Sequence, residues 1–513
     1  MENNDPTLPA DLTTAHRQIR EQAKTLRQQN LLITKLQHQL EMLLRQRYGR
    51  KGEKVDPAQL LLFAQEIMAQ AEPSTAPKTE VAEKPKTGGH GRKPLPASLP
   101  RKPIIHDVLP EDLACPECGE ERRKIGEEVR EQLEYVPASL IVLQHIRPKY
   151  ACKSCQSQVI IAPRLPEPIE KGVPGTGLLA HLVVSKYLDH LPLYRLEGIF
   201  RRQGVELSRA TMCDWMARCG ELLAPIVNRM HDEILNSFII QTDDTTVPVQ
   251  DKTRDRTKTG RLWAYLGDRD HPYIVYDYTP DHTSSGPEQF LDRYKSGYLQ
   301  SDAYAGYGKI HARGIIEVSC WAHTRRKFYE ARTSDAERSH AALAWISLIY
   351  DVERSAKERE LSDDARLISR LEKSRPILES FANWLEIERT KVLPKSPMGE
   401  AIAYARSNWI ALNRYLESGS IDIDNNASER ALRTVALGRK NWLFAGSDAG
   451  GKTAATLISL CMTCKTLGVE PFSYIRDVLD RVSTHPNSRI DELLPDRWAK
   501  LKAEAEAMTD RKE

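Results

Sequence analysis

Hydrophobic residues recur every seven positions near the start of the chain. The series is Leu12, Ile19, Leu26, Ile33 and Leu40. Leu36 and Leu43 follow the last two members by three positions each. A seven-residue repeat places an apolar seam along one side of a helix, and it predicts a coiled coil over residues 12–44. Asn30 follows Leu26 by four positions, where a polar core residue can fix the register. The second seam is weak at first, so an amphipathic helix packed on its own chain is the alternative.

A basic and then proline-rich stretch follows the heptads. Residues 45–54 carry five cations and one acid, and residues 71–103 contain seven prolines with only positive charge after Glu83. Such a segment does not bury enough apolar surface to fold alone, so we predict a linker over residues 71–105. Arg92 and Lys93, in "GGHGRKPLP", resemble part of a flexible arm that tracks DNA phosphates.

Five short β-rich runs and one helix-like run occupy residues 237–323. In chain order they are "SFIIQT", "GRLWAYLG", "YIVYDYT", the helix-like "SSGPEQFLDRY", "GYLQSDAYAGY" and "IIEVSCWAH". This order is that of an RNase H-like mixed sheet, in which the first strand lies beside the fourth. We therefore expect a multidomain α+β protein with an RNase H-like core.

Helical patterns lie on both sides of the strands. Residues 175–225 are helix-patterned with a turn at Gly204, and Ser208 is a candidate N-cap for a helix that carries Arg209 and Arg218. This pattern fits a helix-turn-helix whose second helix enters the major groove. The domains predicted from the whole pattern are 1–70 (coiled coil and basic helix), 71–105 (linker), 106–165 (zinc ribbon), 170–230 (helical DNA-binding region), 235–445 (catalytic domain with a helical insertion at 325–420) and 446–513 (C-terminal helices).

Composition narrows the setting in which the chain acts. The 513 residues are 40% hydrophobic and 28% charged, and no apolar run approaches the length of a membrane span. The polar start "MENNDPTLPADL" is unlike a secretory signal. We expect a cytoplasmic, nucleoid-associated protein without a membrane partner. The formal net charge of +3 says nothing about nucleic acid, so the distribution of charge must be considered instead.

Four cysteines form two CxxC pairs around a strand-rich stretch. Cys115 and Cys118 precede a gap of 33 residues, and Cys152 and Cys155 follow it. Each pair offers two thiolates, and together they predict one structural Zn²⁺ in a zinc ribbon. Free cysteines in a small β-domain are the alternative. A third pair, Cys461 and Cys464, lies in an apolar helix-like run and is interpreted as small buried hydrophobes.

Two aspartates follow predicted neighbouring strands. Asp243 comes after the first strand and Asp302 after the fourth, so both carboxylates are expected at the same edge of the sheet. Carboxylates this close repel unless a cation lies between them, and oxygen ligands suit Mg²⁺ or Mn²⁺. A third carboxylate would complete a two-metal site, in which one ion activates a water or a 3′-hydroxyl and the other stabilises the leaving oxygen.

The stretch "NNASERALRTVALGRKNW" supplies a candidate for that third acid. Glu429 is alone there among four cations that suit the DNA backbone, namely Arg430, Arg433, Arg439 and Lys440. Arg325 and Arg326, after His323 in "AHTRRKF", are further candidate DNA contacts. His323 is either a structural histidine or a phosphate neighbour. Taken singly, the three acids also fit turn formers or a helix N-terminal residue, while Asp422 and Asp424 fit loop or cap residues.

These motifs together resemble the insertion sequence 66 family of bacterial Asp-Asp-Glu transposases. The matching stretches are "QTDDTTVPV", "KTGRLWAYLGD", "GYLQSDAYAGY", "CWAHTRRKF", "IDNNASERALRTVALGRKNWLFAGSDAGG" and the double-CxxC segment with "GRKPLPASLPR" before it. The resemblance implies that Asp243, Asp302 and Glu429 are the catalytic triad, with a helical insertion before the third member. One residue departs from the family pattern, because Asp244 stands where the family usually has Glu.

The resemblance also implies a reaction and partners. A homodimer or higher oligomer would bind the element's terminal inverted repeats, hydrolyse the end phosphodiester and transfer the freed 3′-OH to target DNA, without ATP. Accessory proteins of the same element are further implied partners.

Two other functions fit parts of the sequence. The stretch from Gly446 to Thr453 matches the phosphate-loop spacing G-x-x-x-x-G-K-T, although no apolar strand ending in Asp follows it, as an ATPase would need. A DNA-binding regulator or an inactive transposase relic would equally use the coiled coil, zinc ribbon and helix-turn-helix. The three placed carboxylates argue against a pure DNA binder, which has no use for acids beside phosphates.

Overall fold

The computed structural model describes residues 174–510, except 252 and 254, and several short pieces nearer the start of the chain. Those pieces are residues 16, 20–26, 29, 140–145, 149–150, 160–161 and 167–169. The chain divides into two compact units, one of residues 1–72 with 146–513 and one of residues 73–145. The fold described below is that of the first unit. In the second unit only residues 140–145 are described, and they form no strand, although their stretch was predicted to be strand-rich.

Most predictions for the N-terminal third fall outside the described residues. This holds for Arg92 and Lys93, for the four predicted zinc ligands and for most of the coiled coil, of which residues 20–26 are described and are helical. Strands β1 (Lys149–Tyr150) and β2 (Ile160–Ile161) pair antiparallel, one on each side of the second CxxC pair in sequence.

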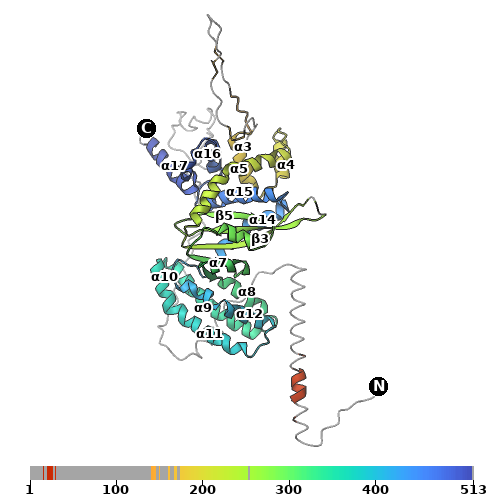
Figure 1. Cartoon of the computed structure of the whole chain (residues 1–513), viewed down its shortest axis with the longest axis vertical. Helices are drawn as coiled ribbons and strands as arrows, with labels where there is room; N and C mark the ends of the chain where they lie inside the picture. The colour runs from red at the N-terminus through yellow and green to blue at the C-terminus, as the bar shows by residue number, and fades with distance from the viewer. Residues whose placement is uncertain are drawn as a thin grey trace, which may run out of the picture. The chain divides into compact units, whose positions relative to one another are not determined.

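The centre of the described fold is a five-stranded mixed sheet (Figure 1). Its strand order is β5-β4-β3-β6-β7, with β5, β4 and β3 antiparallel to one another and β3, β6 and β7 parallel. The bounds are β3 (Ile239–Val249), β4 (Lys258–Leu266), β5 (Ile274–Thr279), β6 (Tyr298–Ser301) and β7 (Ile316–Ser319). The five strands follow the predicted order, and β3 lies beside β6 as predicted. The predicted end of the first strand is wrong, because β3 continues through Asp243 and Asp244 to Val249.

Both faces of the sheet are covered, which explains the nearly continuous apolar run "LWAYL" in β4. On one face, Tyr265 stacks on Phe290 of helix α6 (Ser285–Phe290), with ring centroids 3.6 Å apart. On the other face, the Tyr276 hydroxyl donates 2.8 Å to the Ala431 carbonyl of helix α14 (Asn426–Trp442). Successive strand residues point to opposite faces, so the same alternation decides which acids of β3 face α14.

Helix α15 (Asp448–Thr466) covers the free edge of β5. The Ser459 hydroxyl accepts a 2.8 Å hydrogen bond from the Tyr276 amide, and Thr463 bonds both the amide and the carbonyl of Ile274. Side chains of a helix thus replace a missing neighbouring strand, which protects the edge from pairing with another chain.

The predicted helix-turn-helix residues form two helices joined by a tight turn. Helix α4 (Leu193–Arg202) ends before Gly204, which adopts φ +81°, and α5 (Arg209–Ile234) begins after Ser208. The Ser208 hydroxyl accepts a hydrogen bond from the Thr211 amide at 3.1 Å, which confirms the predicted N-cap. These helices share one apolar core with the sheet, α3 (Thr176–Tyr187), α14, α15, α16 (Pro471–Arg481) and Trp498 of α17 (Pro495–Asp510).

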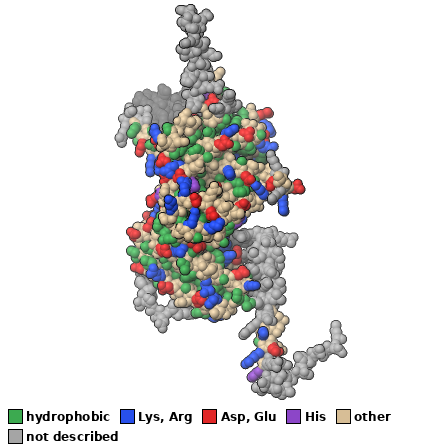
Figure 2. All heavy atoms as spheres, viewed as in Figure 1, with side chains coloured by type: hydrophobic (Ala, Val, Ile, Leu, Met, Phe, Trp, Pro, Cys, Tyr) green, Lys and Arg blue, Asp and Glu red, His purple; other side chains and the backbone are tan. Residues whose placement is uncertain are grey.

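A second apolar core lies in the helices between β7 and α14, which occupy the stretch predicted to be helical (Figure 1). They are α8 (Trp321–Ala331), α9 (Ala336–Glu358), α10 (Asp363–Ser369), the π-helical turn η3 (Arg370–Ser374), α11 (Arg375–Arg389), α12 (Pro397–Ser407), α13 (Trp409–Asn413) and the 3₁₀ turn η4 (Arg414–Leu416). Trp321 and Phe381 are buried at its centre, and Arg370 is buried beside Glu353, with Nε and Oε1 2.7 Å apart. On the face shown in Figure 2, acidic and basic side chains are interspersed.

Candidate active site

Asp243 lies on β3, and Asp302 directly follows β6, the parallel neighbour of β3. The pairs between β3 and β6 are Ile239 with Tyr298, Ile240 with Leu299 and Gln241 with Gln300. Two further steps along the same register bring Asp243 opposite Asp302, which directly follows the last residue of β6. Aligned residues of neighbouring strands point to the same face, so both carboxylates are directed to one side of the sheet.

The chain before α14 runs beside β6, the end of β7 and the body of β3, and it brings Glu429 towards these aspartates. Gln300 of β6 donates 2.6 Å to the Asp422 carbonyl, and the Trp321 amide, just after β7, donates 3.2 Å to the Ile423 carbonyl. The Asn425 side chain then donates 3.3 Å to the Thr242 carbonyl of β3. Helix α14 therefore begins directly beside the strand that carries Asp243, with Glu429 in its first turn.

The three carboxylates share one electrostatic environment. The pKa of Asp243 is raised from 3.8 to about 7, mainly by burial; a hydrogen bond from the Asp244 amide opposes this rise, and the charges of Asp302 and Glu429 add to it. The sequence separates these residues widely, so only the fold brings their charges together. The prediction that all three acids converge is consistent with this coupling.

His323 and Arg326 of α8 approach Glu429. His323 Nε2 lies 3.6 Å from Glu429 Oε1, and Arg326 lies 3.9 Å from Oε2. Burial lowers the pKa of His323, although the charges of Glu429 and Asp302 act in the opposite direction. Glu429 Oε1 and His323 Nδ1 are both buried without a hydrogen-bond partner. A buried carboxylate oxygen without a donor is costly, and it is the kind of atom that a cation stabilises.

Asp244 faces away from this group. Its carboxylate accepts a 2.6 Å hydrogen bond from Arg261 and lies 3.3 Å from His282 Nε2. Because neighbouring strand residues point to opposite faces, Asp243 and Asp244 cannot both face α14. The geometry favours Asp243 as the member of the acidic group, as the motif register predicts.

Several supporting residues were not singled out by the sequence. The Tyr404 hydroxyl of α12 donates 3.1 Å to the Asp302 carbonyl, and the Tyr304 amide donates 3.1 Å to the Asp302 carboxylate. Asn425 is the third such residue. The double asparagine in "IDNN" was the available signal for it, whereas nothing near Tyr404 marks a site. Asp424 is a loop and cap residue, as predicted, because it accepts hydrogen bonds from the Asn426 amide and Tyr350.

The donor set suits a hard cation such as Mg²⁺ or Mn²⁺. Asp243, Asp302 and Glu429 offer only oxygen ligands, and one of these oxygens is buried without a donor. Within the part of the chain that the structure describes, no group of three or more His, Cys, Asp or Glu residues is already arranged to hold a metal ion. The oxygen ligands of the three acids fit the chemistry of such an ion.

The predicted DNA-binding cations differ in their surroundings. Arg430, Arg433 and Lys440 are exposed along α14. Arg439 is different, because its guanidinium donates to the carbonyl of Thr246 and, at 2.7 Å, to its hydroxyl, so it joins α14 to β3. A direct phosphate contact by Arg439 would require that link to break.

On the proposed recognition helix and on α8, the predicted cations have acidic neighbours. Arg209 lies 3.4 Å from Glu197, and Arg218 lies 3.0 Å from Glu221, although both arginine side chains are about two-thirds exposed. Arg326 faces Glu429, as described above, and Arg325 lies next to it on α8. Exposed pairs of this kind contribute little to stability, so they leave these arginines able to exchange their carboxylates for phosphates.

The phosphate-loop motif does not form a phosphate loop. Ser447 caps α15, and Gly450, Gly451, Lys452 and Thr453 lie inside the first turns of that helix. Ala445, before the motif, makes only an isolated bridge to Val249 in place of the strand that a nucleotide site needs. The ATPase interpretation therefore loses its structural basis. Cys461 and Cys464 are free and buried in α15, as predicted.

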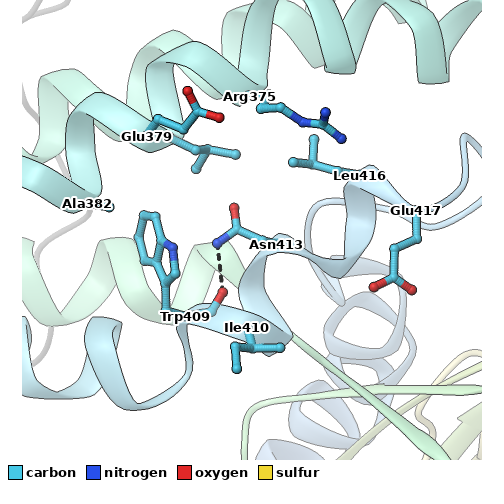
Figure 3. A pocket seen from close by; sticks show the side chains of 9 residues that line it. Arg375, Glu379, Ala382, Trp409, Ile410, Asn413, Leu416 and Glu417 are labelled. Atoms are coloured by element: carbon cyan, nitrogen blue, oxygen red, sulfur yellow. Dashed lines mark hydrogen bonds between the residues drawn. The ribbon is translucent and has the colours of Figure 1, made fainter.

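A separate hollow lies in the helices between β7 and α14 (Figure 3). Its volume is about 410 Å³, and its walls come from α11 and from the α13–η4 segment, with Trp409, Leu378 and Ile410 among its apolar lining residues. None of the residues around Asp243 lines it.

Comparison with known proteins defines the class as a transposase. A family model described as "Transposase IS66 family" matches residues 171–453, which include all three acids. Models described as "zinc-finger binding domain of transposase IS66", "Transposase C of IS166 homeodomain" and "IS66 C-terminal element" match residues 112–156, 35–104 and 459–495. The chain belongs to the transposase IS66 family.

The chain is also similar to proteins of comparable length. In Sinorhizobium fredii, "Uncharacterized protein y4hP" is 32% identical over 508 residues, covering 92% of this chain and 90% of its own. "Uncharacterized protein y4qI" of the same organism is 34% identical, covering 91% of this chain and 89% of its own.

In the described residues, no helix is both long and apolar enough to cross a membrane.

Proposed function

We propose that the chain is a DNA transposase of the Asp-Asp-Glu type, with Asp243, Asp302 and Glu429 as its catalytic acids and an RNase H-like sheet as its core. The observation that supports the proposal is that the charges of Asp302, after β6, and of Glu429, on α14, both act on the carboxyl of Asp243 on β3. The strand order, with two antiparallel neighbours on one side of β3 and two parallel strands on the other, supports the assignment of the core.

The chemistry follows from the donor set. Bound to the three acids, two Mg²⁺ or Mn²⁺ ions would supply Lewis acidity at the reacting phosphate and a nucleophile at neutral pH. In the first reaction a water oxygen attacks phosphorus at the element end, and the bond to the 3′-oxygen breaks to leave a 3′-hydroxyl. In the second, that hydroxyl attacks a phosphorus of target DNA, and the target's own 3′-oxygen leaves. Neither reaction uses a covalent enzyme intermediate or ATP.

Other parts of the chain hold the DNA and the protomers. His323 and Arg326 orient Glu429, and Arg430, Arg433 and Lys440 take backbone phosphates along α14. The zinc-finger region, the basic arm with Arg92 and Lys93, and the α4–α5 pair bind the terminal repeats. One Zn²⁺ held by the four paired cysteines stabilises that region, and the coiled coil pairs two protomers or builds a higher oligomer. Accessory proteins of the element join this complex, and the setting is the nucleoid.

The test is DNA cleavage and strand transfer by single-acid variants. Asp243→Asn, Asp302→Asn and Glu429→Gln should each lower cleavage of DNA carrying the element end by at least about 1,000-fold with Mg²⁺, while binding of that DNA is retained. Asp277→Asn is the matched control, because Asp277 is a partly buried acid of β5 whose pKa is raised by burial to about 6. Its variant should cleave like the wild type.

The rival function gives a different result. A non-catalytic regulator or relic binds the element end, but neither the wild type nor any variant cuts it. Wild-type cleavage that survives loss of Asp243 or Asp302 would overturn the assignment of the acids.

A further inference from the structure

The connection between α14 and α15 exposes two apolar side chains on a strained turn. Leu443 adopts φ 63° and ψ −49°, and the Phe444 amide donates 2.7 Å to the Trp442 carbonyl, which closes a γ-turn at Leu443. A positive-φ γ-turn is rare and strained for a residue with a Cβ. Leu443 is 62% exposed and Phe444 is 44% exposed. The strained turn and the exposed apolar side chains both disfavour the folded state. Their occurrence at the same place therefore points to a function.

Firm contacts on both sides hold this turn in place. Before it, the Trp442 indole packs so closely on Gly438 that a Cβ there would lie 2.5 Å from its Nε1. After it, the Ala445 amide donates 2.9 Å to the Pro248 carbonyl, and the Ala445 carbonyl accepts 2.8 Å from Gln250. The backbone has little room between these anchors, and it directs Leu443 and Phe444 outward. We call these two residues the apolar tip.

The apolar tip lies at the end of the basic surface of α14. Exposed Arg430, Arg433 and Lys440 lead along the helix towards it, and Leu437 adds a partly exposed apolar side chain. From α4, exposed Arg195 donates 3.2 Å to the side chain of Asn441, two residues before Leu443. An apolar tip bordered by cations complements a polyanion whose interior is apolar, and duplex DNA has this character.

Two independent distances place the apolar tip relative to the acids. From Glu429 to Trp442 the helix advances roughly 20 Å at 1.5 Å per residue. From Asp243 to Val249, which bridges to Ala445, β3 also advances roughly 20 Å. A duplex rises 3.4 Å per base pair, so DNA lying along α14 with a phosphate at the acids meets the tip about six base pairs away.

We propose that Leu443 and Phe444 form a wedge that enters bound DNA and opens a base step about six base pairs from the cleaved phosphodiester. The proposal rests on the proposed function, because it takes the acids as the point where DNA is cut. It adds a distortion of the DNA at a defined position. An apolar side chain inserted between base pairs partly unstacks them and bends the duplex, and the gain is closer contact with the cations on either side.

Base opening can be measured without catalysis. Duplexes that carry the terminal repeat, with the fluorescent base 2-aminopurine at successive positions on either side of the cleavage point, would be bound by zinc-loaded full-length protein without added Mg²⁺ or Mn²⁺. The fluorescence of the wild-type complex should rise at one position about six base pairs from the cleavage point. The Phe444→Ala variant should lose that rise and bind the paired duplex about tenfold more weakly.

Two control variants separate the wedge from general effects. Ile410→Ala removes another exposed apolar side chain, from α13, and should keep both the fluorescence rise and the affinity. Lys440→Ala should lower the affinity for DNA and make that affinity less dependent on salt. Once saturated with protein, the DNA should still show the rise in 2-aminopurine fluorescence.

A mismatch placed at the responding position should restore the affinity of Phe444→Ala to within about twofold of the wild type, because the base step is already open. The wedge is overturned if 2-aminopurine is silent at every position in the wild-type complex, or if Phe444→Ala leaves affinity and fluorescence unchanged. In the second case the tip contacts protein instead. These measurements are made without Mg²⁺ or Mn²⁺, so they do not depend on cleavage. Failure of the proposed function would therefore show separately, as a wild-type protein that distorts DNA but does not cut it when Mg²⁺ is added.

Discussion

Asn425 donates a side-chain hydrogen bond of 3.3 Å to the carbonyl oxygen of Thr242, the residue directly before Asp243. Asn425 is fully buried and precedes α14, whose first turn carries Glu429. One amide therefore joins the strand and the helix that bring two of the three acids together, although 183 residues separate the bonded pair in sequence.

This relationship predicts that Asn425→Ala impairs the site more than the fold. Loss of one buried hydrogen bond should lower the free energy of unfolding by about 1–2 kcal/mol, measured by urea denaturation. Glu429 would lose its fixed position, so cleavage should fall at least about tenfold, and a higher Mg²⁺ concentration should be needed for half-maximal rate. Asn413→Ala is the control, because its amide donates 2.7 Å to the Trp409 carbonyl within α13, which carries none of the three acids. Equal cleavage by both variants would refute the positioning role.

Local patterns predicted the elements of this fold but not how its distant parts meet. The β-rich runs gave five strands in the right order, because alternation and apolar content are local properties. The end of β3 was missed because Asp243 and Asp244 resemble turn formers, whereas pairing with Ala264 and Trp263 keeps them in the strand.

The candidate site shows the same limit. The acids were found from motif resemblance and strand order, while Asn425 and Tyr404 were not, because their partners lie far away in sequence. Arg439 was grouped with three exposed cations, since the sequence does not show that Thr246 lies within its reach.

A second prediction concerns the competition between protons and metal ions at Asp243. The pKa of its carboxyl is raised from 3.8 to about 7, so without metal the folded state binds this proton more tightly than the unfolded state. Its contribution to stability is therefore present at acidic pH and is lost as the pH rises from about 4 through about 7. Mn²⁺ takes the place of the proton, so it should raise the melting temperature more at about pH 8 than at about pH 6.

The measurement is thermal unfolding of the zinc-loaded protein without and with added Mn²⁺ across this pH range. At an ion concentration of 100 times Kd the gain should be about 2.7 kcal/mol for one site. Asp243→Asn should reduce the pH-dependent loss, of which the part due to Asp277 remains because its pKa is raised to about 6, and should remove most of the ion-induced gain. Asp277→Asn should keep the gain, because Asp277 lies on β5 away from the other acids. An ion effect that is the same in wild type and Asp243→Asn would place the metal elsewhere.

A third prediction tests the meaning of the Gly446–Thr453 motif. A Cβ at Gly451 would lie 2.6 Å from the Tyr278 ring, whose hydroxyl donates 2.6 Å to Asp448, so the ring cannot easily move. Gly451→Ala should therefore cost about 1–3 kcal/mol of unfolding free energy. Gly446 has no atom within 4 Å of such a Cβ, and Gly446→Ala should stay within about 0.5 kcal/mol of the wild type.

If the motif were a phosphate loop, both glycines would contact the nucleotide. Gly446→Ala and Gly451→Ala would then both weaken ATP binding. The wild type should bind no ATP in a filter assay, and Lys452→Ala should cleave DNA at the wild-type rate. ATP binding that Lys452→Ala abolishes would restore the nucleotide interpretation.

The last prediction is that Leu443→Gly stabilises the protein while it weakens its action on DNA. Leu443 holds a positive φ of 63°, and relief of such strain is worth about 1–3 kcal/mol, less about 0.5–1 kcal/mol for the greater freedom of glycine in the unfolded chain. The side chain is mostly exposed, so little buried contact is lost. The matched control is Leu437→Gly, inside α14 and 45% exposed, which should instead lose about 1 kcal/mol. Urea denaturation would show opposite signs for the two variants. A rise in stability combined with loss of the 2-aminopurine signal would mean that the strain at Leu443 is kept for the sake of DNA distortion, because the fold alone would be better served by glycine.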